Sequence, residues 1–314
     1  MTGRILVFGG AHIDRRGRIS GETAPGASNP GSWFEEPGGG GFNAARNLAR
    51  LGHRVRMISP RGGDSTGEAV AAAAAAAGID DRPFVFLDRK TPSYTAILER
   101  DGNLVIALAD MELYRLFTPR RLGIRAVREA IDDADLILCD GNLPEETIAA
   151  LAALADDLGK PLAAIAISPA KVVRFREVLP RIDYLFMNEA EAAAIAGIRP
   201  ENPDQWPAIL RGLGLKGGAI TRGGRETIAF SGTVAASLAP PAIGEIADVT
   251  GAGDSFAAGV LSALIAGLPL DQAMRHGAAA AAITLQSPFA TAEELSQDLL
   301  NERLPLVPDA RILR

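Results

Sequence analysis

The sequence predicts an α/β protein built on a doubly wound, mostly parallel sheet flanked by helices. Short apolar runs alternate with longer amphipathic stretches, which is typical of repeated strand–helix–strand units. Of the 314 residues, 47% are hydrophobic and 22% are charged, an ordinary balance for a globular enzyme with a large core. Two stretches lack a long helix pattern and predict a small additional sheet. We expect a single domain over residues 1–314.

The elements of the main domain follow from these patterns. Apolar runs of strand length are expected at Arg4–Phe8, Arg54–Ile58, Leu136–Cys139, Pro161–Ile167, Tyr184–Met187, Gly218–Thr221 and Thr227–Ala229. Helices are expected at Phe42–Leu51, Ser65–Ala77, Pro119–Asp132, Pro144–Leu158, Ala170–Leu179, Glu189–Ala196, Trp206–Gly214, Ser255–Ala266, Leu270–Gln286 and Ala292–Arg303. The alanine run Ala71–Ala77 is a good helix former, and we expect it to be buried and to end at Gly78.

The two stretches without helix patterns lie at about 13–37 and 84–111. In the second, strands are expected at Phe84–Leu87, Ser93–Glu99 and Leu104–Leu108. The turn Asp101-Gly102-Asn103 between alternating apolar residues is a strong hairpin signal. Both stretches are therefore predicted to form a small sheet outside the main one.

Composition excludes several classes of protein. A net charge of −6 and a pI near 5.3 argue against a nucleic-acid partner, which usually requires a basic face. No run approaches the ~18 apolar residues of a membrane span, and the apolar part of the N-terminus is too short for a signal peptide. We therefore expect a cytoplasmic protein without a membrane partner. The single Cys139 allows neither an internal disulfide nor a cysteine-based metal site.

The most informative motif is Asp-Val-Thr-Gly-Ala-Gly-Asp at residues 248–254, directly before an expected helix. Gly251, Ala252 and Gly253 have almost no side chain, so their N–H groups can approach an oxyanion closely. The helix start adds unpaired N–H groups and the positive end of its dipole. Asp254 beside such an anion hole makes sense as a base that takes a proton from a hydroxyl during phosphoryl transfer. The alternative is a tight turn in which Asp254 is only an N-cap.

A second motif is the glycine run 38–41, which opens an apolar, alanine-rich helix. Glycines at Gly39, Gly40 and Gly41 let the backbone lie against a sugar, and Asn43 offers both a donor and an acceptor to vicinal hydroxyls. A capped core helix alone would explain the apolar side chains of the helix but not four consecutive glycines.

Together these motifs resemble the ribokinase (PfkB-type) family of carbohydrate kinases. The resemblance rests on Asp248-x-Thr250-Gly251-Ala252-Gly253-Asp254 with Gly259, and on the glycine run with Asn43 and Gly52; it covers roughly residues 4–290. It implies a ribokinase-like fold, ATP and Mg²⁺ as cofactors, and a small-molecule ribosyl substrate. It also implies that the small sheet is a lid that excludes water and pairs two chains into a homodimer.

The resemblance assigns further residues. Asp14 follows the first strand and would accept hydrogen bonds from ribose hydroxyls, although His12 stands where relatives usually carry Asn; a turn is the alternative for Asp14. Thr221 and Gly223 would contact ATP, while Glu226 replaces an expected glycine.

Two more assignments concern cations. Asn188 would lie beside ATP, and Glu191 would organise Mg²⁺ through water, but the same pair also suits a helix capping box. Asp248 and Thr250 are candidates for a monovalent cation such as K⁺.

Narrower features resemble the pseudouridine kinase branch of the family: Asn29-Pro30-Gly31, Thr91-x-Ser93-Tyr94, Asp110-Met111 and Asp140-x-Asn142. Ser93 and Asp110 could hydrogen-bond a uracil-like edge, while Met111 and Tyr94 offer apolar or stacking surface. Ordinary sheet packing is the alternative for these residues. Ser168 departs from the aspartate usual in that branch, and Arg174 stands where Lys is common.

The functional hypothesis is an ATP-dependent kinase for the 5′-hydroxymethyl group of a ribosyl nucleoside or sugar, with pseudouridine first. The alternatives are a kinase for ribose, for adenosine or another nucleoside, or for a keto-deoxy sugar acid. A more remote alternative is a non-catalytic sugar or nucleotide sensor on the same fold. A Rossmann dehydrogenase is excluded because Gly9-Gly10-Ala11 lacks the Gly-x-Gly-x-x-Gly pattern.

Overall fold

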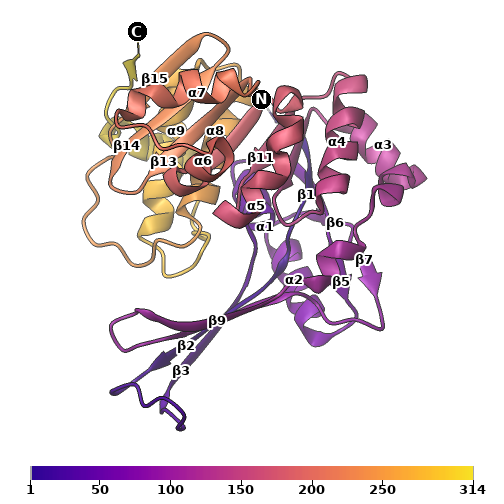
Figure 1. The fold of residues 1–314 in the computed structure, drawn as a ribbon, viewed down its shortest axis with the longest axis vertical. Helices are drawn as coiled ribbons and strands as arrows, with labels where there is room; N and C mark the ends of the chain where they lie inside the picture. The colour runs from indigo at the N-terminus through magenta and orange to yellow at the C-terminus, as the bar shows by residue number, and fades with distance from the viewer. Residues whose placement is uncertain (1, 314) are drawn as a thin grey trace.

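The computed structural model describes residues 2–313 and has a ten-stranded sheet at its centre (Figure 1). The strand order is β16-β15-β14-β13-β12-β11-β10-β1-β4-β6. Neighbours from β6 to β13 pair in parallel, and those from β13 to β16 are antiparallel. The strands are β1 Arg4–Phe8, β4 Arg54–Ile58, β6 Asp80–Asp81, β10 Leu136–Asp140, β11 Leu162–Ile165, β12 Tyr184–Asn188, β13 Gly217–Arg222, β14 Arg225–Ser231, β15 Val234–Leu238 and β16 Arg311–Ile312. The predicted doubly wound, mostly parallel sheet is confirmed.

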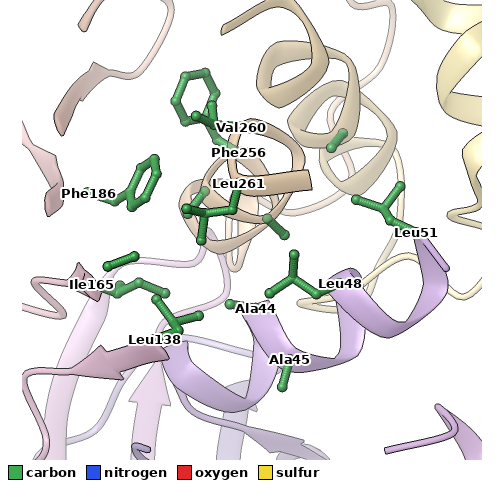
Figure 2. Packing of buried hydrophobic residues seen from close by; sticks show 14 of the residues in the cluster. Ala44, Ala45, Leu48, Leu51, Leu138, Ile165, Phe186, Phe256, Val260 and Leu261 are labelled. Carbon is green, nitrogen blue, oxygen red and sulfur yellow. The ribbon is translucent and has the colours of Figure 1, made fainter. Parts of the chain in front are cut away.

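Helices cover both faces of this sheet. One core contains α1 Gly40–Arg50, α2 Ser65–Ala76, α8 Ala252–Ile265, α9 Leu270–Leu285 and α10 Gln297–Arg303. The other contains α3 Arg125–Asp133, α4 Glu145–Asp157, α5 Pro169–Val172, α6 Glu189–Ala196 and α7 Trp206–Gly212. Alternate residues of β1 divide between the cores, with Ile5 and Val7 in the first and Leu6 and Phe8 in the second. Figure 2 shows the first core, where Leu48 of α1, Leu261 of α8 and Ile165 of β11 come together.

Helices α8 and α9 cross at a distance that only glycine permits. A Cβ on Gly259 would lie 2.6 Å from the carbonyl oxygen of His276, and one on Gly277 would lie 2.8 Å from that of Phe256. Because the two backbones are in contact, the position of α8 is fixed along its length, including the end that carries Asp254.

The predicted small sheet is present and extends away from the main body (Figure 1). Its strands are β2 His12–Ile19, β3 Gly31–Gly38, β8 Ser93–Leu98 and β9 Leu104–Asp110, in the order β3-β2-β8-β9. The predicted strand Phe84–Leu87 does not join it. Residues Phe84–Phe86 form β7, which pairs with β5 Pro60–Gly62. The Phe84 side chain packs against the main body, with its ring centre 5.5 Å from that of Phe117. We call the four-stranded sheet the lid.

Some predicted helices needed correction. The segment 119–132 divides into the 3₁₀ helix η2 Pro119–Gly123 and α3, and 170–179 divides between α5 and the 3₁₀ helix η3 Val173–Arg181. Helix α10 begins only at Gln297, because the Ser296 side chain accepts a hydrogen bond from the Leu299 N–H at 3.2 Å and caps it there. Another 3₁₀ helix, η1 Glu112–Leu116, follows the lid.

The expectation that Ala71–Ala77 is buried was wrong. Only Ala74 of that run is buried, and α2 contacts the core through the narrow stripe of Val70 and Ala74. Alanine favours the helix by its intrinsic propensity, which does not depend on burial. Within residues 2–313, no helix is both long and apolar enough to cross a membrane.

Candidate active site

The predicted site residues gather at the edge where the parallel strands end. A cavity of about 680 Å³ opens there, beyond the carboxyl ends of β1, β10, β11, β12 and β13. Of the residues predicted for the site, the following line it: Asp14, Gly39, Gly40, Asn43, Met111, Asn188, Glu191, Thr221, Thr250, Gly251, Gly253 and Asp254. Motifs from both ends of the chain therefore meet in one place.

The remaining predicted residues lie elsewhere. Ala252 and Gly223 line an adjoining cavity, and Asp248 contacts the lid. The Gly41 N–H donates to the carboxylate of Asp140 at 2.9 Å. Ser93 and Asp110 are paired across β8 and β9, next to the pair Tyr94 and Ala109.

That register decides which lid residues face the cavity. Tyr94 and Ala109 line it, whereas Ser93 and Asp110 do not. Neighbouring residues of a strand point to opposite faces of the sheet, so the two pairs are directed away from each other. Met111, just beyond the end of β9, also lines the cavity.

The glycine motif lies at a helix start, as the sequence predicted. Gly251 has a φ of 75° and precedes α8, whose first turn carries Asp254. A Cβ on Gly251 would lie 1.8 Å from the carbonyl oxygen of Ala290, so only glycine fits. One of the three expected N–H groups, that of Ala252, makes a long hydrogen bond of 3.4 Å to the Val249 carbonyl.

The Asp254 carboxylate is held at the start of α8 and is hard to ionise. Burial raises its pKa to about 7; the hydrogen bond from Asn43 lowers it, and the carboxylates of Asp140, Glu191 and Asp14 raise it further. The Asn43 Nδ2 donates to Asp254 Oδ2 at 2.8 Å. A carboxylate that titrates near neutral pH is well matched to accepting a proton from an alcohol.

Asn43 is used differently from the sequence expectation. Its Oδ1 accepts a hydrogen bond from Arg46 Nη2 at 2.7 Å, while one Nδ2 hydrogen is donated to Asp254. The second Nδ2 hydrogen remains for a substrate hydroxyl.

The buried carboxylate of Asp140 organises the glycine-rich backbone. It accepts hydrogen bonds from the N–H groups of Gly10, Gly41 and Asn142 at 2.8, 2.9 and 2.8 Å. Three backbone segments are thereby joined by one side chain. Sequence reasoning noted Asp140 only as part of a motif and missed this role.

Two further residues of the cavity were not predicted. Lys171 lines it and donates from Nζ to Asn142 Oδ1 at 2.6 Å. His12 also lines it, with Nδ1 2.8 Å from the Tyr114 hydroxyl and Nε2 3.2 Å from Asp14 Oδ1. The position of Lys171 shortly after β11 was an available signal, because loops after parallel strands face the ligand crevice.

Asn188 and Glu191 form the capping box that was the alternative interpretation of this pair. The Asn188 N–H donates to Glu191 Oε2 at 2.7 Å, and the Glu191 N–H donates to Asn188 Oδ1 at 2.9 Å. Both residues nevertheless line the cavity. Among the described residues, no group of three His, Cys, Asp or Glu side chains could hold a metal ion. Glu191 would suit a Mg²⁺ ion that is bound largely by phosphates and water.

Asp248 is already engaged by protein groups. Its Oδ1 accepts hydrogen bonds from the Thr250 N–H and hydroxyl at 2.8 and 2.7 Å, and its Oδ2 pairs with the Arg16 guanidinium from the lid. A monovalent cation at this carboxylate would compete with Arg16.

An adjoining cavity of about 490 Å³ is mostly apolar. It shares Thr221, Gly253 and Phe256 with the first cavity, so the two meet at the start of α8. Its other lining residues include Leu238, Pro240, Pro241, Ile246, Val249, Ala278, Ala281, Ala282 and Leu285. An apolar slot of this kind fits a planar aromatic base.

The comparisons with known proteins agree with this geometry. The profile described as pfkB family carbohydrate kinase matches residues 2–296. The pseudouridine kinase of Escherichia coli (strain K12) is 27% identical over 296 residues, which cover 93% of both proteins. A solved structure of a carbohydrate kinase from Agrobacterium tumefaciens is 64% identical, with a TM-score of 0.90 and complete coverage of both chains.

A more distant solved structure shares the fold. The Arabidopsis thaliana ribokinase complexed with ribose and ATP is 22% identical, with a TM-score of 0.85 over 97% of this chain and 99% of that one. The ribokinase-like fold is thus confirmed. Because the family profile spans nearly the whole chain, this protein belongs to the pfkB family of carbohydrate kinases and is a phosphotransferase that acts on a sugar or nucleoside.

Proposed function

We propose that this enzyme transfers the γ-phosphoryl group of ATP to the 5′-hydroxymethyl group of a ribosyl nucleoside, with pseudouridine as the preferred acceptor. The observation that carries the chemistry is the Asp254 carboxylate, which lines the first cavity next to Gly253, where the apolar cavity adjoins it. The first cavity would hold the acceptor and the phosphates, and the apolar one would hold the adenine. The similarity to a pseudouridine kinase supports the choice of acceptor.

The residues at the start of α8 would carry out the transfer. Asp254 would take the proton of the attacking hydroxyl, whose oxygen forms the new bond to the γ-phosphorus as the bond to ADP breaks. N–H groups of Gly251 and Gly253 would donate to the transferred group. Mg²⁺, near Glu191 and Asn188, would offset the charge of the phosphates. Thr221 and Gly223 would contact the nucleotide.

The acceptor would lie between the lid and the glycine run. Asp14 would accept hydrogen bonds from the ribose hydroxyls, and Gly39 and Gly40 would let the backbone approach the ring. Tyr94 and Met111, which line the cavity, are better placed for the base than Ser93 and Asp110. Lys171 Nζ has donors beyond the one that Asn142 uses, and these suit a base carbonyl.

A panel of acceptors tests this proposal. ADP release would be measured with pseudouridine, uridine, cytidine, adenosine, ribose and a keto-deoxy sugar acid, each with MgATP. Turnover with pseudouridine well above the others is expected, and Asp254→Asn should lose at least ~100-fold in kcat while still binding ATP. An active Asp254→Asn variant would remove Asp254 from the role of base.

The other acceptors discriminate among alternatives. Preference for the sugar acid would indicate that Lys171 recognises a carboxylate, and preference for ribose would discard the assignment of Tyr94 and Met111 to a base. Absence of turnover with every acceptor would contradict the proposed activity.

We also propose a homodimer formed through the lid. Strand β9 is an edge strand, and its Leu104, Ile106 and Leu108 side chains are 57%, 65% and 71% exposed. Exposed apolar residues on an unpaired edge favour association with another chain.

Light scattering of the wild type and of Ile106→Glu tests the dimer. The wild type should have twice the mass of the chain, and Ile106→Glu should be a monomer. Ile198→Glu is the matched control, because Ile198 is 54% exposed but lies outside the lid. A monomeric wild type would contradict the proposal.

A further inference from the structure

Helix α1 places a buried cation behind the catalytic carboxylate. Arg46 is only 7% exposed, and its guanidinium lies 4.7 Å from the centre of the Phe42 ring. Its Nη2 donates to the Pro37 carbonyl and to Asn43 Oδ1, both at 2.7 Å, while its Nε has no hydrogen-bond partner. Burying a charged group this deeply costs folding free energy unless hydrogen bonds and opposite charges nearby offset that cost.

The two partners of Asn43 allow only one orientation of its amide. Arg46 can only donate, and an ionised Asp254 can only accept. With the amide as it stands, Oδ1 faces the guanidinium and Nδ2 faces the carboxylate. Rotating the amide by 180° would bring donor against donor and acceptor against acceptor, so Arg46 determines which group Asn43 presents to Asp254.

The charge of Arg46 also acts on an acidic region. Asp14, Glu36 and Asp254 all interact electrostatically with it. The groups that face Asp254 come from several elements, namely Asp14 of β2, Asp140 of β10, Glu191 of α6, and Asn43 and Arg46 of α1; Lys171 lines the same cavity. Carboxylates outnumber cations in this set, so losing Arg46 would leave Asp254 facing mostly negative charge.

We propose that Arg46 is a positioning residue for Asp254: it fixes the Asn43 amide so that its N–H donates to the carboxylate, and it places a positive charge behind the acidic cluster. This inference rests on the proposed function of Asp254 as the base. Arg46 lines neither cavity, so it would act on Asp254 through the Asn43 amide and through its charge.

The first test measures Asp254 directly, without turnover. The protein would be labelled with ¹³C at the aspartate carboxyls, and the Asp254 signal assigned by its loss in Asp254→Asn. In Arg46→Met, the pKa of Asp254 should rise by about one unit, because an opposite charge and an oriented donor are lost together. Arg46→Lys keeps the charge and should stay within about 0.3 unit of the wild type.

Arg50→Met is the matched control. Arg50 lies one turn further along α1 and is also partly buried, but it interacts with Glu293 and Glu294 rather than with Asn43. Its replacement should leave the pKa of Asp254 within about 0.3 unit of the wild type. An equal shift in Arg50→Met and Arg46→Met would reduce Arg46 to a general electrostatic effect and overturn the proposal.

The second test uses the pH profile of kcat. With a pKa one unit higher, the ionised fraction of Asp254 at pH 7 falls about five-fold, so kcat should fall about five-fold there and the difference should shrink toward pH 9. A purely structural defect would lower kcat equally at both pH values. If the wild type phosphorylates no acceptor, the proposed function fails, while the carboxyl titration still decides the role of Arg46.

Arg46→Gln is the second variant should Arg46→Met fail to fold. It removes the charge but keeps polar atoms near Asn43, and an upward shift is expected again. In an Asn43→Leu background, Arg46→Gln should raise the pKa of Asp254 by less than it does in the wild type, because only the effect of the charge is left to lose. A folded Arg46→Met or Arg46→Gln variant with the wild-type pKa of Asp254 would overturn the proposal.

Discussion

At the level of single residues, the Asp254 carboxylate lies where burial opposes its ionisation. Its pKa is raised to about 7 from an ordinary value of 3.8, so the folded protein holds the proton more tightly than the unfolded chain. Below pH 4 the carboxyl is neutral in both states and adds no penalty. Between pH 4 and pH 7 the unfolded chain binds fewer protons, so stability falls as the pH rises. The penalty is complete above pH 7 and is at most about 4 kcal/mol.

Asp254→Asn should therefore stabilise the protein at high pH. Its Tm should equal that of the wild type near pH 4 and exceed it by about 5 °C at pH 8, as measured by thermal unfolding. Asp132→Asn, at an exposed position, is the control and should give the same small difference at both pH values. A Tm difference for Asp254→Asn that does not grow with pH would contradict the raised pKa.

At the level of elements, α8 begins where two backbone segments touch. Gly251 has a positive φ and contacts Ala290, and Gly259 contacts His276 one helix away. The same helix start presents Asp254 and the N–H groups of the proposed anion hole. Packing between α8 and α9 is thus coupled to the geometry of the site.

Two glycine substitutions separate the cost of backbone strain at a positive φ from the cost of a clash with Ala290. Gly251 and Gly52 both have positive φ, but a Cβ on Gly52 meets nothing within 4 Å. Gly52→Ala should cost about 1 kcal/mol in the free energy of unfolding and leave kcat unchanged. Gly251→Ala should cost clearly more and lower kcat at least ~100-fold, because α8 must shift away from Ala290. Equal losses of stability and activity in the two variants would show that contact with Ala290 is unimportant.

At the level of the whole molecule, the lid is tied to the main body through Arg16. This side chain of β2 pairs with Glu36 of β3 and with Asp248, and Glu36 in turn accepts a hydrogen bond from the Ala290 N–H at 3.2 Å. The lid is therefore connected to both segments that surround Gly251. Closure over the site would keep water from the phosphoryl group.

Arg16→Gln should loosen this connection. ADP release without an acceptor should rise several-fold, and the freed Asp248 carboxylate should make activity more responsive to K⁺ than in the wild type. Arg18→Gln is the control, because Arg18 lies on the same strand but is exposed. The assays would compare ADP release and phosphorylated product, with and without K⁺. If Arg16→Gln released no more ADP than it formed phosphorylated product, and its response to K⁺ were unchanged, the proposed connection would be contradicted.

Local patterns were enough to predict most elements and much of the site. Glu189–Ala196 was predicted with the bounds of α6, because the two residues of its capping box, Asn188 and Glu191, are only three positions apart in the sequence. The motif at residues 248–254 predicted a helix directly after it, and α8 begins there, whereas the close contact of Gly251 with Ala290 was not predicted. Such patterns involve residues within one or two helical turns of each other, so they can be recognised in the sequence without knowledge of the tertiary structure.

Other features depended on residues distant along the chain. Periodicity could not tell that Ser93 and Asp110 turn away from the cavity while Tyr94 faces it, because that depends on the register between β2, β8 and β9. Nor could it show that Arg46 orients Asn43, or that Arg16 reaches Asp248, since both depend on the position of a side chain in three dimensions.

The sequence by itself determined the fold class, and it singled out the motif that we propose to hold the anion hole and the base, because each depends on local spacing and on residue chemistry. Only the tertiary structure decided which groups surround Asp254 and therefore how strongly it holds a proton. Burial and the electrostatic field at that carboxylate depend on groups from β2, β10, α1 and α6, and no short segment of the chain contains them.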